Sequence, residues 1–242
     1  MLRGLLIGAF FFTMTPLLIS IQWLLDRLNL PGWGFIAVNY YRVLCRLLRI
    51  RVHVIGEPVA DRAVLFVSNH ISWADILVIG SVRPVAFVAK REVAAWPLVG
   101  VTARLQRTVF VDRTRRHQTG EAIAEMVKRL VRVVKDAAAR ADFGGKFMIQ
   151  PMSIGYTNTH GIPMGRQRRP LVAWYGDLDF MPHIKDFIAR GAVDAVVSYG
   201  EPVVADADAD RKAMAESLEG AVRALTSATL RGRPRQAHAK AS

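Results

Sequence analysis

A histidine and an aspartate five positions apart, His70 and Asp75, have the residue types and spacing for acid–base chemistry. On a single helix they would point about 140° apart around the axis and could not easily meet. If His70 lies in the turn before a helix, its ring can fold back toward Asp75. A carboxylate on one ring nitrogen fixes the tautomer, so the other nitrogen can take a proton from a substrate hydroxyl. The pair therefore predicts a general base that works without an enzyme nucleophile.

Both residues also have a purely structural explanation. Ser72 and Asp75 have the spacing of a capping box, in which Asp75 would bind backbone N–H groups at the start of a helix. His70 could be an ordinary hydrogen-bonded loop histidine. Ser68 is a weak candidate for a nucleophile, because no nucleophile-elbow pattern surrounds it. From the residues alone, catalysis and helix capping both stay open.

The elements around this motif are short apolar runs that alternate with amphipathic segments. The runs at residues 51–55 and 63–68 predict strands, and residues 74–80 predict a helix that begins just after His70. Further strands or apolar runs are expected at 84–89, 108–111, 147–154, 171–175 and 195–199, and further helices at 121–134 and 209–230. The pattern predicts an α/β fold with a buried mixed sheet flanked by helices.

The N-terminal segment is predicted to meet a membrane. Residues 4–25 contain no charged residue, and a helix of that length reaches about 33 Å, enough to cross a hydrocarbon core. A helix lying in the membrane plane is the alternative, because Pro16 interrupts the backbone bonding and polar residues dilute the apolar run. Residues 33–50 carry arginines on one helical face, which predicts an interfacial helix, or else a helix packed on the body: Arg42, Arg46 and Arg49.

Composition narrows the class of partner. The formal net charge is +13, with 33 Lys and Arg against 20 Asp and Glu, which favours an anionic partner. The 52% hydrophobic content and the apolar N-terminus favour membrane lipids and phosphorylated lipid substrates over nucleic acid. The basic excess after the apolar run predicts a catalytic domain on the cytoplasmic side of the inner membrane. Cys45, the single cysteine, excludes an intrachain disulfide and a cysteine-based metal site, and is expected to be a small buried hydrophobe.

Four blocks, in order, resemble the lysophosphatidic-acid (1-acyl-glycerol-3-phosphate) acyltransferase family, over roughly residues 35 to 205. The first is Asn69-His70 followed by Asp75, which matches the family's Asn-His-four-residues-Asp block. The others include Phe87 to Lys90 with Trp96-Pro97, Phe110 to Arg113, and Ile149 to Ile154 with Pro151. Residues 156–166 and 200–202 resemble a proteobacterial branch that includes lyso-ornithine lipid acyltransferases.

The resemblance implies an enzyme of phospholipid biosynthesis. A fatty acyl group would pass from acyl-CoA or acyl carrier protein to the free hydroxyl of a lysophospholipid, turning lysophosphatidic acid into phosphatidic acid. His70 would be the base, Asp75 would orient it, and Arg113 would grip the substrate phosphate. The remaining substrate-site residues carried over are Asn69, Lys90 and Pro151. No metal and no cofactor besides the acyl donor are expected. The alternative within this class is a lyso-ornithine lipid O-acyltransferase.

One family block, roughly Phe-Pro-Glu-Gly, is missing, since no glutamate occurs between Glu125 and Glu201. This absence keeps a second alternative open, a non-catalytic membrane-associated relative that lost its acceptor block. The predicted organisation is a membrane helix at 1–30, an interfacial helix at 31–50, and an acyltransferase domain at 51–205 that lacks a strand-loop block near 136. A C-terminal helix at 206–230 and a basic disordered tail at 231–242 are expected to follow.

Overall fold

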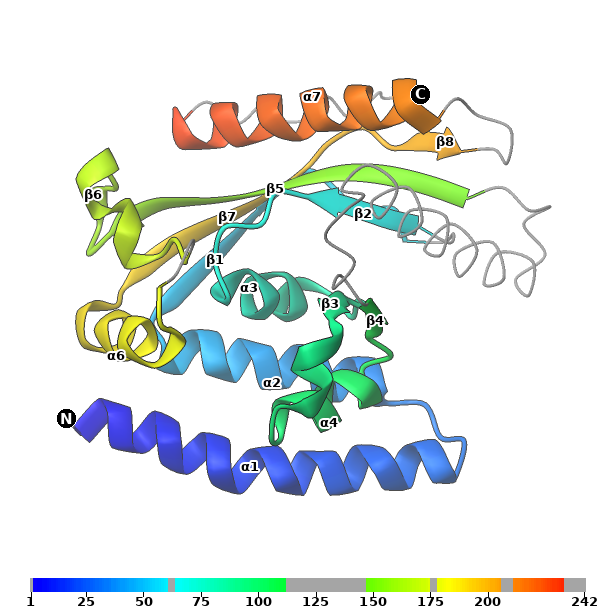
Figure 1. Ribbon diagram of the computed structural model, residues 1–242, viewed down its shortest axis with the longest axis vertical. Coiled ribbons are helices and arrows are strands. Elements are labelled where there is room, and N and C mark those ends of the chain that lie inside the picture. The colour runs from blue at the N-terminus through cyan, green and yellow to red at the C-terminus, as the bar shows by residue number, and fades with distance from the viewer. Residues whose placement is uncertain (1, 61–63, 112–146, 175–177, 206–210, 233–242) are drawn as a thin grey trace. The chain divides into compact units, whose positions relative to one another are not determined.

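The computed structural model describes residues 2–60, 64–111, 147–174, 178–205 and 211–232. The chain divides into two compact units that interleave along the sequence. The helical unit comprises Met1–Arg51, Ser72–Ala122 and Gln167–Ala192, and the sheet unit comprises Val52–Ile71, Ile123–Arg166 and Val193–Ser242. The predicted α/β class with a mixed sheet is confirmed (Figure 1).

The sheet unit is built on one long strand, β5 (Phe147–Thr159), which runs through the middle of the sheet. The order is β1-β7-β5-β2, with β5 parallel to β2 and antiparallel to β7 and β8. A two-residue turn with positive φ at both residues, His160 and Gly161, joins β5 to β6. The bounds of the other strands are β1 Ile50–Ile55, β2 Val64–Ser68, β6 Ile162–Pro163, β7 Val193–Tyr199 and β8 Val203–Ala205.

A C-terminal helix, α7 (Arg211–Leu230), covers this sheet along β5 (Figure 1). Its apolar face, predicted from the helical spacing, buries Leu218 and Val222. Leu218 packs with Ile149 of β5, and Leu65 and Val67 of β2 pack against that pair. Burial of this apolar face, rather than intrinsic helix propensity, holds α7 in place.

On the edge of β5 opposite β2, the pairing strand changes from β8 to β7. Two residues of β5 lie at this change. Residues 147–149 pair with β8, residues 152–159 pair with β7, and Gln150 and Pro151 lie between the two ladders. Pro151 has no N–H to offer a ladder, and its carbonyl accepts from Gly200 N–H at 2.8 Å. The buried Gln150 side chain donates to the carbonyls of Glu57 and Gly200 and accepts from Val59 N–H, each at 2.9 Å.

The helical unit packs α2 (Trp33–Leu47) against α3 (Ala74–Val82), and Gly80 makes this close approach possible. A Cβ at Gly80 would lie only 2.9 Å from Cγ of Tyr41 and closer still to other ring atoms. Cys45 is buried in the same helix, as expected. Burial raises the pKa of Tyr41 to about 12 and that of Cys45 to about 11, so both groups stay neutral at physiological pH.

The remaining elements of the helical unit are short. β3 pairs in parallel with β4 as a separate two-stranded sheet. The remaining bounds are α1 Leu2–Arg27, β3 Val88–Lys90, η1 Arg91–Ala95, α4 Val99–Leu105, β4 Val109–Val111 and α6 Phe180–Arg190. A further 3-10 helix, η2 (Arg166–Leu171), begins in the sheet unit and continues in the helical unit.

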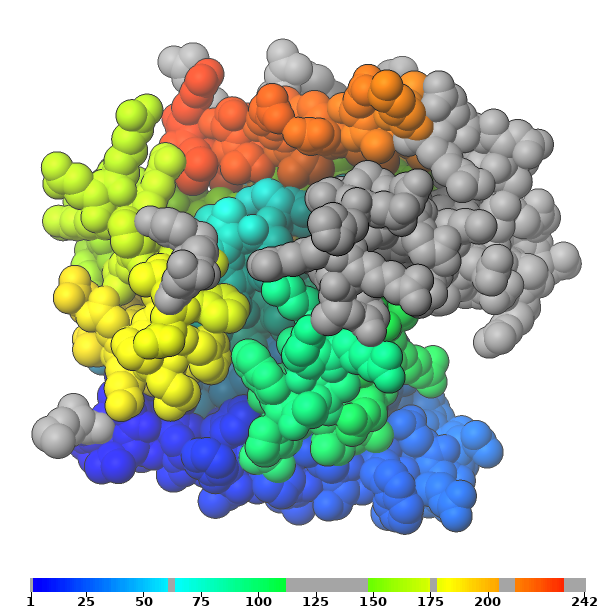
Figure 2. All heavy atoms as spheres, in the orientation of Figure 1, coloured from blue at the N-terminus to red at the C-terminus, as the bar shows by residue number. Residues whose placement is uncertain are grey.

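The first helix, α1, holds to its unit through three polar side chains and through Phe10 and Leu18, which pack on α2. Arg3 donates to the carbonyls of Leu47 and Ile188, which lie near the C-terminal ends of α2 and α6. Thr15 hydrogen-bonds to the Tyr40 hydroxyl, and Gln22 donates to the Leu105 carbonyl. Figure 2 shows α1 at the surface of its unit. The exposed large apolar side chains of α1 are Leu2, Leu5, Leu6, Phe12, Leu17, Ile21, Trp23 and Leu24.

Two sequence expectations have a different outcome, and two others are not tested. The strand predicted at 171–175 is wrong, because residues 171–174 end a 3-10 helix and continue as irregular chain. The apolar run at 84–89 forms a strand only from Val88 onward. The helix predicted at 121–134 and residues 233–242 of the predicted tail lie outside the described residues.

Candidate active site

His70 lies two residues beyond the carboxyl end of β2, in irregular chain, and its side chain is exposed. α3 begins four residues later, so the prediction that His70 precedes the helix is confirmed. β2 is parallel to β5 over Val64 to Ser68. Residues just past the carboxyl ends of parallel strands are where α/β proteins commonly build their sites. The position therefore suits a base that must reach a substrate from outside.

Asn69, next to His70, is fixed to the sheet by its side chain. Its Nδ2 donates to the Ile154 carbonyl and its Oδ1 accepts from Ile154 N–H, both at 2.9 Å. The amide thus bonds to β5 as another strand residue would. These two bonds fix the position of the backbone at Asn69, and therefore also the position of the neighbouring backbone at His70. Substrate binding by Asn69 stays a prediction.

Asp75 lies in the first turn of α3 and is only 1% exposed. Its Oδ2 accepts from Ser72 N–H at 2.9 Å, while Ser72 Oγ accepts from Ala74 N–H at 3.2 Å. Asp75 therefore makes its half of the expected capping box, whereas the Ser72 hydroxyl bonds to Ala74 N–H and the Asp75 N–H bonds to the Ser72 carbonyl. A carboxylate offers about four lone-pair positions, so one capping bond does not exhaust it.

The boundary between the two units falls between Ile71 and Ser72, inside the predicted motif. His70 belongs to the sheet unit with β2, and Asp75 belongs to the helical unit with α3. The orienting role of Asp75 and the basic role of His70 stay predictions.

The two cationic residues expected in the substrate site belong to the small β3–β4 sheet or to the chain just after it. Lys90 is the last residue of β3, is exposed, and lies opposite Val111 of β4 in the parallel register. Parallel strands end at the same edge, so Lys90 lies at the edge from which the chain leaves β4. Arg113 follows Val111 by two positions and lies outside the described residues.

Pro151, the last predicted substrate residue, is buried in the sheet unit. It lies opposite Val67 in the β2–β5 register, and its ring packs beside Gly200. The contact joins two of the resembling blocks, 149–154 and 200–202. These contacts give the proline a structural place within the sheet, where it ends one ladder of β5.

Trp73 and His183 are two residues that sequence reasoning missed. The indole N–H of Trp73, two positions before Asp75, donates to His183 Nδ1 at 3.0 Å. The rings of Phe180 and Phe187, on the same helix as His183, meet the Trp73 ring edge to face. The spacing 180, 183, 187 is that of one helical face and is the sequence signal that could have found this group.

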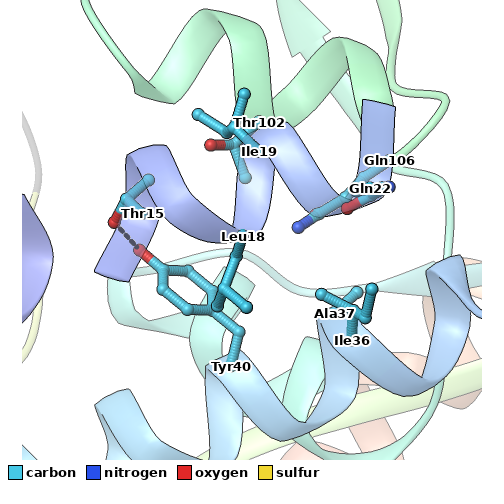
Figure 3. A pocket seen from close by; sticks show the side chains of 9 residues that line it. All are labelled: Thr15, Leu18, Ile19, Gln22, Ile36, Ala37, Tyr40, Thr102 and Gln106. Carbon is cyan, nitrogen blue, oxygen red and sulfur yellow. Dashed lines mark hydrogen bonds between the residues drawn. The ribbon is translucent and has the colours of Figure 1, made fainter. Parts of the chain in front are cut away.

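A small cavity lies elsewhere in the helical unit, between α1, α2 and the end of α4 (Figure 3). Its empty volume is about 260 Å³, including open solvent at its mouth. Thr15 and Gln22 of α1 line it together with Tyr40 and Gln106. None of the predicted site residues lines it, so we do not place the reaction there.

Comparison with known proteins finds lipid acyltransferases among the similar proteins. A family sequence model described as Acyltransferase matches residues 49–135. The lyso-ornithine lipid O-acyltransferase of Brucella abortus is 38% identical over 259 residues, covering 96% of this chain and 97% of that protein. The protein of the same name from Rhizobium meliloti is 36% identical, with 97% and 89% covered. The 1-acyl-sn-glycerol-3-phosphate acyltransferase of Neisseria meningitidis is 34% identical over 80 residues, 31% of each chain.

The fold also matches a crystal structure, that of the 1-acyl-sn-glycerophosphate acyltransferase PlsC from Thermotoga maritima. The TM-score is 0.55 at 20% identity, with 97% of this chain and 98% of that chain covered. The alignment with the Brucella protein is longer than the 242 residues of this chain, so that relative carries residues without a counterpart here.

Proposed function

Because this chain belongs to the lipid acyltransferase family, we propose that it transfers a fatty acyl group to the free hydroxyl of a lyso-ornithine lipid. The observation that carries the proposal is similarity along nearly the whole of both chains to two proteins of that activity. The similarity to the Neisseria protein, which acts on the glycerophosphate, extends over 31% of the chain. Acylation of lysophosphatidic acid is therefore the second candidate.

In the proposed reaction His70 acts as the general base. Its imidazole takes the proton of the lipid hydroxyl while that oxygen attacks the thioester carbonyl of the donor, acyl-CoA or acyl carrier protein. A C–O bond forms, the C–S bond breaks, and the proton returns to the departing sulfur. Asp75 holds the ring in the tautomer that accepts the proton and stabilises the imidazolium. The exposure of His70 supports this role, because the lipid hydroxyl must reach the ring.

With a lyso-ornithine lipid as acceptor, Arg113 would bind a carboxylate instead of a phosphate. A lyso-ornithine lipid has the ornithine carboxylate where lysophosphatidic acid has a phosphate. Guanidinium groups bind carboxylates and phosphates through the same bidentate geometry. In this proposal Arg113 binds the acceptor's anionic group in either case.

A competition between acceptors tests the function. Purified protein in mixed micelles is given lyso-ornithine lipid or lysophosphatidic acid, with acyl-CoA or acylated carrier protein as donor. We expect kcat/KM for lyso-ornithine lipid to exceed that for lysophosphatidic acid at least tenfold, since a site fitted to one head group leaves the other unpaired. The reverse preference would establish the second candidate. Turnover of neither lipid with either donor would favour the non-catalytic relative.

We further propose that α1 lies in the plane of the membrane rather than across it. α1 is the one helix among the described residues that is long and apolar enough to cross a bilayer. Yet its start, middle and end are bonded to its own unit, through Arg3, Thr15 and Gln22. The unit also carries exposed arginines on α2, which could not follow α1 into the hydrocarbon core. A helix that is held to its unit along its length and exposes a large apolar face suits burial in one leaflet.

Removing the outer apolar face is expected to release the protein from vesicles. We choose Leu5, Phe12 and Trp23, which are 70%, 69% and 56% exposed, for simultaneous replacement by glutamine. Each replacement removes roughly 1.5–3 kcal/mol of favourable transfer free energy from water to lipid. The affinity for vesicles in a flotation assay should therefore fall at least about 100-fold. The matched control replaces three exposed apolar residues of the sheet unit: Ile162, Val203 and Val204.

Two outcomes would contradict the in-plane placement. One is full flotation of the α1 variant. The other is a wild-type protein that stays in the membrane after alkaline carbonate extraction, as a spanning helix does. Interfacial attachment predicts release by carbonate and flotation of the control variant.

A further inference from the structure

One face of α6 contacts Trp73, which lies between His70 and the start of α3. Trp73 lies three positions after His70 and two before Asp75. Its ring contacts Phe187 at 5.3 Å and Phe180 at 6.0 Å between centroids, both edge to face. Phe187 is fully buried. Aromatic contacts tolerate a range of ring placements, so by themselves they define the position of the indole only loosely.

The hydrogen bond to His183 removes that freedom and fixes the state of the histidine. Indole N–H can only donate, so Nδ1 of His183 must be the acceptor. With Nδ1 accepting, the ring can carry a proton only on Nε2. That nitrogen is buried and has no hydrogen-bond partner among the described residues. A buried donor left unpaired carries an energetic cost, so a purely structural residue at this place would more easily be apolar.

We propose that His183 is a positioning residue for the acyl transfer reaction, acting through Trp73 on the loop from His70 to Asp75. The inference rests on the proposed function, because it assigns His183 to the same site. Trp73 directly precedes α3, and Ser72 on its other side donates its N–H to Asp75. A rotation of the indole therefore moves the backbone that sets the Asp75 carboxylate.

Small displacements of this kind have large effects on rate. A misplacement of about 1 Å in a reacting group can cost about 100-fold in rate. Loss of the Trp73–His183 bond leaves the aromatic contacts and the fold in place. The acceptor and donor sites are untouched, so the effect falls on kcat and leaves KM near the wild-type value.

Three variants separate this role from plain packing. His183→Leu removes the acceptor and keeps the volume, Trp73→Phe removes the donor, and His183→Asn restores an acceptor oxygen near the place of Nδ1. We expect His183→Leu and Trp73→Phe each to lower kcat by about 10- to 100-fold at unchanged KM. The double variant should be no slower than the slower single variant, because both remove one bond. His183→Asn should recover most of the rate.

Trp174 supplies a matched control. Its indole N–H also donates to one acceptor, the Leu178 carbonyl at 2.7 Å, and its ring also meets Phe180 edge to face. Trp174 lies outside the loop, so Trp174→Phe should keep kcat within about twofold of wild type. Folding is checked for every variant by thermal unfolding, and the indole N–H resonance of Trp73 should shift in His183→Leu and return toward its place in His183→Asn.

The inference and the proposed function fail in different ways. An inactive wild-type protein would contradict the proposed function. An active wild type whose Trp73→Phe or His183→Leu variant loses no more rate than Trp174→Phe would overturn the positioning role alone. Multiplying losses in the double variant, or no recovery in a folded His183→Asn protein, would also overturn it.

Discussion

Replacing His70 by alanine is expected to lower kcat for lipid acylation by about 10²- to 10⁴-fold, with little change in folding stability. General-base assistance contributes rate factors of this size. The imidazole is exposed and lies beyond the end of β2, so its loss opens no cavity in the sheet core. The measurement is the steady-state rate with a saturating donor, together with thermal unfolding of the same preparation.

His53 provides the control for that experiment. It is an exposed histidine on β1 of the same unit, so His53→Ala removes an equal side chain from a comparable surface. Its rate should stay within about twofold of wild type. A His70→Ala protein that keeps more than about a tenth of the rate would show that the imidazole is not the base.

Replacing Asp75 by asparagine is expected to lower kcat by about 10²- to 10³-fold. Asparagine keeps the size of the side chain and an oxygen that can accept from Ser72 N–H, so the capping bond survives. It loses the negative charge that fixes the tautomer of the base and stabilises the imidazolium. The rate should therefore fall while the thermal unfolding temperature stays near that of the wild type.

The capping explanation makes the opposite prediction. If Asp75 only caps α3, Asp75→Asn should keep the rate. Ser72→Ala removes the other capping bond, from Ala74 N–H to Ser72 Oγ, and should cost about 1 kcal/mol of stability. A folded Asp75→Asn protein with a wild-type rate would remove the carboxylate from the mechanism.

The elements predicted best from sequence are those that show as a run or a regular spacing of apolar residues within one short segment. The apolar runs at 63–68, 147–154 and 195–199 correspond to β2, β5 and β7, because buried strands need apolar residues on both faces. The amphipathic spacing at 209–230 corresponds to α7. The run at 171–175 misled, because a short apolar stretch has no period that separates a strand from buried irregular chain. Val172 is buried there without strand pairing.

Side-chain hydrogen bonds between residues far apart in the sequence could not be predicted. The Asn69 amide bonds to Ile154, 85 positions away, and no local pattern indicates that bond. His183 and Trp73 are 110 positions apart, and each in isolation is an ordinary helix or loop residue. The helix that carries His183 was missed altogether. Its Pro182 reads as a helix breaker, although proline is tolerated in a first helical turn, where its missing N–H would have no intrahelical partner.

The contacts of α1 with its own unit also determine what happens when α1 is deleted. Deleting the helix to obtain a soluble fragment would strip the Tyr40 hydroxyl and the Leu105 carbonyl of their partners. It would also uncover the apolar surface of α2 on which Phe10 and Leu18 pack. Truncation at residue 27 is therefore expected to yield inclusion bodies rather than a working soluble enzyme.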